Sequence, residues 1–103
     1  MAEISCISPI DGAVVAVRQA MDAAAATATI KAARATQTAW AARPLDERIA
    51  LVNAGVKALG AANDEIVPEL ARMMGRPVRY GGEFGGVEER ASHMASIASA
   101  TLG

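Results

Sequence analysis

The corner formed by Gly75 and Pro77 constrains the fold of this chain most, because it ends one helix and forbids its continuation. Glycine readily takes the left-handed conformation that closes helices, and proline lacks the N–H that another helical turn would need. The apolar residues before this corner recur three or four positions apart: Ile66, Leu70 and Met73. We therefore predict a helix over residues 64–75, with Asn63 or Asp64 as its N-cap.

Three further helices are predicted from the same periodicity, over residues 22–42, 45–61 and 84–102. Asp22 is a suitable N-cap for the first, and Pro44 separates it from the second. The second carries the clearest apolar stripe: Leu45, Ile49, Val52, Val56 and Leu59. Gly60 is expected only to loosen its end.

The N-terminal part of the chain has a different pattern. Two short apolar runs flank Ser8-Pro9-Ile10-Asp11-Gly12, in which proline, aspartate and glycine supply turn geometry. This pattern predicts a β-hairpin over residues 4–17. The expected fold is therefore mainly α, with an N-terminal β-hairpin and about four helices.

Composition excludes several classes of function. Hydrophobic residues make up 52% of the 103 residues, but only three residues are aromatic, so an alanine-rich core would be thin and would favour packing against something larger. The net charge of −1 gives no electrostatic footprint for nucleic acid or an anionic membrane. No apolar run is long enough for a bilayer, and no signal peptide is evident. We expect a soluble, cytoplasmic protein.

Three features suggest chemistry, and each has a plainer explanation. The glycine-rich tract 81–86 fits neither common phosphate-binding spacing, so it is better explained as the start of a helix. Cys6 could be a nucleophile, but no histidine, lysine or helix N-terminus lies nearby in the sequence to activate it, which favours a small buried hydrophobe. His93 is the only histidine and has no evident catalytic partner, which favours a surface or interface position.

The order of these elements resembles the beginning of an aldehyde dehydrogenase. The matching features are a proline–glycine hairpin, an alanine-rich helix ending in tryptophan, a helix opened by proline-x-x-glutamate-arginine, and a glycine-lysine-proline corner. They correspond here to Ser8-Pro9-Ile10-Asp11-Gly12, Ala39-Trp40, Pro44-Leu45-Asp46-Glu47-Arg48 and Gly75-Arg76-Pro77. Two residues depart from the family pattern: Ser8 stands where the hairpin usually has asparagine before the proline, and Arg76 stands where the corner usually has lysine. The resemblance covers essentially the whole chain and rests on the order of the motifs.

The resemblance implies an enzyme that oxidises aldehydes to carboxylates with NAD or NADP through a cysteine thiohemiacetal. The catalytic motifs of the family are not in this sequence. Residues 1–103 would therefore be the N-terminal part of a doubly wound α/β cofactor-binding domain. This segment alone would be inactive and would bind no cofactor. Its partners would be the remainder of its own subunit and an aldehyde, in a homo-oligomer, either a dimer or a tetramer. No nucleic acid or membrane partner is expected.

The resemblance also suggests individual site residues. Counting from the Gly75 corner places Phe84 and Glu88 near positions that line the aldehyde tunnel. Backbone carbonyls near Ile7 and Met73 fall where some family members hold a monovalent cation. Catalytic residues are expected to lie outside this sequence.

Two alternatives stay open at the level of the sequence. The chain could be a stand-alone, non-catalytic helical interaction module, because alanine-rich stripes and a thin core suit docking. A complete enzyme could also make an acyl-thioester or reduce its substrate instead. Neither the aldehyde nor the choice between NAD and NADP follows from these residues.

Overall fold

The computed structural model describes residues 2–80 and 84–103. Its elements, in chain order, are β1 (Glu3–Ile7), β2 (Val14–Gln19), α1 (Ala23–Ala42), α2 (Leu45–Ala61), α3 (Asn63–Met74), the short 3-10 helix η1 (Val78–Tyr80) and α4 (Phe84–Leu102). The expected fold class, mainly α with an N-terminal hairpin, is confirmed. Residues 81–83 of the glycine-rich tract lie outside the described residues.

Strands β1 and β2 pair antiparallel and are joined by a turn whose geometry follows from its residues. Gly12 has a φ of +74°, and its N–H donates to the carbonyl of Ser8 at 2.9 Å. The Asp11 carboxylate accepts the N–H of Ala13 at 2.9 Å. A bulge between Cys6 and Ile7 interrupts the register. The two strands reach from Glu3 to Gln19, slightly beyond the expected 4–17.

Helices α1 and α2 begin and end at the residues that local chemistry indicates. The Asp22 carboxylate accepts the N–H of Ala25 at 2.8 Å and so caps the start of α1. After α1 the chain becomes extended at Arg43, and Pro44 precedes the first residue of α2. Proline has no N–H with which to continue α1, and its fixed φ suits the start of a new helix. The two helices are therefore separate.

The start of α3 differs from the sequence expectation. Its N-cap is Ala62, and neither Asn63 nor Asp64 caps the helix, since both lie inside it. Only Ala62 separates α2 from α3; its N–H donates to Leu59 of α2, and its carbonyl accepts from α3. A side-chain cap needs extended backbone, which this shared residue does not provide (φ −91°, ψ 1°).

The end of α3 follows the expectation. Gly75 is left-handed, with a φ of +76°, and its N–H donates to the carbonyl of Ala71 at 2.9 Å. Beyond it, η1 forms a single short turn that the sequence patterns did not indicate. Pro68 lies within α3 without ending it.

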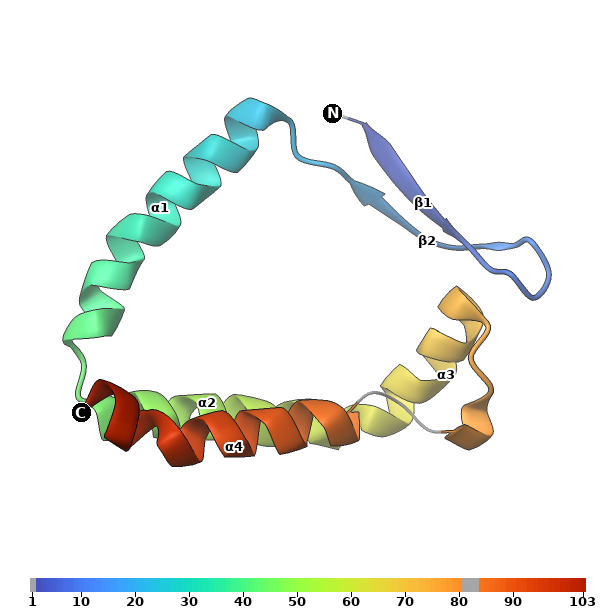
Figure 1. Ribbon diagram of the computed structural model, residues 1–103. Coiled ribbons are helices and arrows are strands. Elements are labelled where there is room, and N and C mark those ends of the chain that lie inside the picture. Colours follow the sequence, from blue (N-terminus) through green and yellow to red (C-terminus); the bar gives the residue numbers. More distant parts are fainter. Residues whose placement is uncertain (1, 81–83) are drawn as a thin grey trace.

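The elements form an open frame instead of a compact globule (Figure 1). Helices α2 and α4 lie side by side and antiparallel along one edge, while α1 and the hairpin form the others. The frame closes where the hairpin meets α3: the Cys6 thiol donates to the Met73 carbonyl at 3.7 Å. The radius of gyration is 18.0 Å, whereas a compact domain of about 100 residues has one of about 13 Å.

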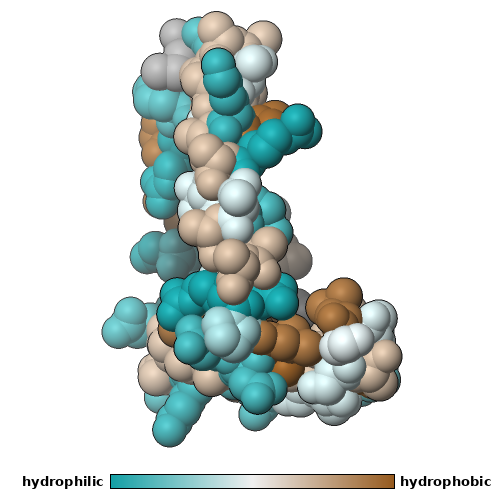
Figure 2. Space-filling model, turned by 90° about the vertical axis from the view of Figure 1, so that its left-hand side faces the viewer, coloured by the Kyte–Doolittle hydropathy of each residue, from teal (hydrophilic) through white to brown (hydrophobic). Residues whose placement is uncertain are grey.

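Little of the described chain is buried. Among residues 2–80 and 84–103 only Ala71 and Ser8 are buried, with 9% and 4% of their surfaces exposed. Ile30, on the apolar side of α1, is 65% exposed. Figure 2 shows weakly hydrophobic residues along the column that α1 forms. Outside the hairpin, packing between elements is therefore concentrated between α2 and α4.

Candidate functional site

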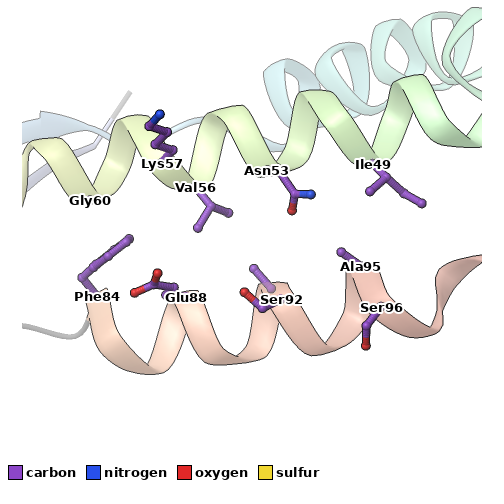
Figure 3. Close-up of a pocket in the computed structure, with 11 residues that line it drawn as sticks. Ile49, Asn53, Val56, Lys57, Gly60, Phe84, Glu88, Ser92, Ala95 and Ser96 are labelled. Carbon is purple, nitrogen blue, oxygen red and sulfur yellow. The ribbon is translucent and has the colours of Figure 1, made fainter.

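A cavity of about 680 Å³ lies in the groove between α2 and α4 (Figure 3). Helix α2 contributes Ile49, Asn53, Val56, Lys57 and Gly60, and α4 contributes Phe84, Glu88, Ala91, Ser92, Ala95 and Ser96. The two helices run antiparallel, so the end of α2 faces the beginning of α4. Apolar and polar side chains share the lining, which suits a polar organic molecule better than a purely apolar one.

Phe84 and Glu88, the two residues expected to line a tunnel, both line this groove. They lie four positions apart on α4, which places them on one helical face. In Figure 3 both side chains are directed toward α2. Asn53 points toward α4 from the other wall, whereas the Lys57 amino group points away from it. The groove therefore has one carboxylate and one amide directed across it.

The Phe84 ring sits against Gly60 of α2. A Cβ atom at position 60 would lie 2.5 Å from Cζ of Phe84 and 2.8 Å from Cε1. Sequence reasoning missed Gly60 as a site residue, because a glycine near a helix end is usually explained by that end. The only signal in the sequence is the position of this glycine within an otherwise well-formed helix.

A second, more apolar cavity of about 300 Å³ lies at the opposite end of the α2–α4 pair. Trp40 from the end of α1 lines it together with Leu45 of α2 and Met94 and Leu102 of α4. The tryptophan near the end of the alanine-rich helix thus lines the same cavity as residues of both helices of the pair.

The two backbone positions suggested for a monovalent cation are brought near each other. Met73 carries the carbonyl that accepts the Cys6 thiol, and Ile7 is the next residue of β1. One of the suggested ligands is therefore already a hydrogen-bond acceptor. In the described part of the chain, no group of three or more His, Cys, Asp or Glu residues could hold a metal ion.

Cys6 and His93 are not brought together as a catalytic pair. Cys6 is half-buried in β1 and hydrogen-bonds to α3. His93 is exposed on α4, where its carbonyl accepts the hydroxyl of Ser96 at 2.6 Å. Among the described residues no hydrogen bond or ion pair is found between them. His93 lies at the surface, as expected from the sequence, whereas Cys6 is less buried than the expected small buried hydrophobe.

The sheet of the described residues differs from the sheet that holds a dinucleotide in doubly wound folds. Dinucleotides bind at the carboxyl ends of parallel strands, against the N-terminus of a following helix. The sheet in residues 2–80 and 84–103 is a two-stranded antiparallel hairpin, which has no such crevice. Nor does any helix of the described residues have the length and apolarity needed to cross a membrane.

Comparison with known proteins decides the family. The sequence profile described as "Aldehyde dehydrogenase family" matches residues 1–101. The chain belongs to the aldehyde dehydrogenase family. No curated protein and no solved structure gave a match.

Membership confirms the resemblance and gives the general activity. Aldehyde dehydrogenases are oxidoreductases that act on aldehydes, generally with NAD or NADP, in a subunit larger than this chain. The match extends from the hairpin to α4, so the groove lies within the family region.

Proposed function

We propose that this chain is the N-terminal segment of an NAD(P)-dependent aldehyde dehydrogenase subunit, within its cofactor-binding domain. The observation that carries the proposal is the family match over residues 1–101. The open frame supports it, because helices that expose residues such as Ile30 and Leu51 have apolar surface to bury against another part of a subunit.

The proposed reaction converts an aldehyde and water into a carboxylate, while NAD or NADP accepts a hydride. A cysteine thiolate would form a thiohemiacetal with the aldehyde, loss of a hydride to NAD or NADP and of a proton would convert it to a thioester, and water would then hydrolyse the thioester to the acid and free the cysteine. Cys6 is a poor candidate for that thiolate, because its thiol is directed at the Met73 carbonyl. The nucleophile and the cofactor site would therefore lie outside residues 2–80 and 84–103, and this segment alone would be inactive.

The segment would contribute one wall of the aldehyde tunnel. Phe84 and Glu88 support this role, because both line the groove between α2 and α4. The aromatic ring would contact the apolar part of an aldehyde, and the carboxylate would favour polar or cationic substituents over anionic ones. We further propose a cytoplasmic homo-oligomer, either a dimer or a tetramer, and a monovalent cation near Ile7 and Met73.

Two measurements test the proposal. Denaturing mass spectrometry of the polypeptide from its native source should give a mass several times the 10.5 kDa of this chain. That polypeptide should then form NADH or NADPH from at least one member of an aldehyde panel. A long polypeptide that leaves every aldehyde and both cofactors unchanged would contradict the proposed activity.

A helical interaction module is the second candidate, and the exposed apolar residues favour it. Met21 and Ile30 are largely exposed and Leu51 is nearly half exposed, as they would be on a chain that docks onto another protein. A native mass of 10.5 kDa would support this alternative and would exclude the family's catalysis. Co-purification would then identify the bound chain.

A further inference from the structure

The contact between Phe84 and Gly60 leaves no room for a side chain at position 60. A Cβ atom there would lie 2.5, 2.8 and 3.2 Å from three ring carbons of Phe84. Carbon atoms pack favourably at about 3.5–4.0 Å. Gly55, earlier on the same helix, has nothing within 4 Å of an equivalent Cβ atom. The two glycines therefore differ: Gly60 packs against an aromatic ring, and Gly55 faces open space.

We propose that Gly60 is a positioning residue that sets the size selectivity of the aldehyde tunnel. Its missing side chain lets the Phe84 ring lie against α2, at one end of the groove that both residues line. The ring thereby reaches across from α4 to α2 at that end and leaves the rest of the groove open. This inference rests on the proposed function, because it assumes that the groove receives the aldehyde.

The geometry indicates which part would move if a methyl group were added. The atoms met first are Cζ and Cε1, the far end of the Phe84 side chain, not backbone. Rotation about the two side-chain torsions of phenylalanine can move these atoms without separating the helices. Helix α2 blocks the direction in which the ring now points, and the cavity that Phe84 and Glu88 line offers open space, so we expect the ring to turn into the groove beside Glu88. The groove would become narrower, while chemistry supplied elsewhere would be unchanged.

The test compares Gly60→Ala with Gly55→Ala in the complete polypeptide that carries this chain. The quantity measured is the ratio of kcat/KM for a bulky aldehyde, 2-naphthaldehyde, to that for acetaldehyde. Gly60→Ala should lower the ratio on the order of tenfold, the usual effect of a small steric change in a substrate pocket. Gly55→Ala should leave it unchanged. Equal ratios in both variants and the natural protein would overturn the proposal.

A double variant separates positioning from general damage to α2. In the Phe84→Ala background the added methyl meets no ring, so Gly60→Ala should have no further effect on the ratio. An effect of similar size with and without the ring would overturn the proposal.

If Gly60→Ala does not accumulate as folded protein, Phe84→Leu and Gly60→Ala/Phe84→Leu replace it. Leucine lacks the ring atoms that meet position 60, so both variants should fold and raise the ratio above that of the natural protein. An unchanged ratio in either would overturn the proposal. Absence of NADH or NADPH formation from any aldehyde by the natural protein would instead contradict the proposed function.

Discussion

The Cys6 thiol lies 3.7 Å from the carbonyl oxygen of Met73 and joins the first strand to the end of the third helix. The two residues are 67 positions apart, so this contact closes the frame of the chain. Beside it, Pro9 lies close to Gly75: a Cβ atom at position 75 would be 3.0 Å from Cγ of Pro9. The hairpin and the helix corner thus meet at a glycine that is also left-handed.

We expect Gly75→Ala to destabilise the protein more than Gly12→Ala. Both glycines have a positive φ, which costs other residues roughly 1–2 kcal/mol. Only Gly75 also has a close neighbour, because an added Cβ at Gly12 has nothing within 4 Å. The difference in unfolding free energy, from urea denaturation, should be about 1 kcal/mol. Equal losses would show that the contact with Pro9 does not constrain the corner.

Asp22 should be important for α1 because its carboxylate caps the helix. Asp22→Ala removes the bond to the Ala25 N–H and should cost about 1 kcal/mol of stability. Asp22→Asn keeps an acceptor at the same position and should cost much less. Helicity by circular dichroism and the urea midpoint measure both variants. A loss as large for asparagine as for alanine would contradict a capping role.

Helix α1 should be less protected from amide hydrogen exchange than α2 and α4 in the 103-residue chain. Most of the stability of a helix in a protein comes from tertiary packing, and residues such as Ile30 of α1 remain largely exposed. Helices α2 and α4 are held by each other. Amide hydrogen exchange should therefore be faster in α1 than in α2 and α4. Equal protection across the three helices would show that α1 is packed in solution.

Glu88 should influence the choice among charged aldehydes if the groove receives the substrate. Glu88→Gln removes a negative charge from the lining and should raise kcat/KM for carboxylate-bearing aldehydes several-fold relative to neutral ones. Glu89→Gln is the matched control, because Glu89 is exposed and does not line this groove. The prediction fails if the two variants change the ratio equally.

Phe84→Ala should alter aldehyde preference in the complete enzyme. The ring lines the groove, and its removal leaves space for a larger substrate. The relative kcat/KM for aromatic over short aldehydes should rise by roughly tenfold. An unchanged profile across short and aromatic aldehydes would remove Phe84 from the tunnel.

Most element ends could be predicted from the sequence, because they depend on neighbouring residues. Asp22 caps α1 through an N–H three positions away, and Gly75 closes α3 through a carbonyl of the same helix. Pro44 acts through its own ring. Asn63 shows the limit of such reasoning: it has the chemistry of a cap, but α2 ends one residue too close.

By itself, the sequence determined the helices, the hairpin and the family, because periodicity, caps and motif order are properties of the chain alone. Only the tertiary structure decided that α2 pairs with α4, that Gly60 receives the Phe84 ring, and that the apolar side of α1 stays open. Alanine-rich faces resemble one another and can pack in several ways. The pairing therefore depends on where the corners at Ala62 and Gly75 direct each helix.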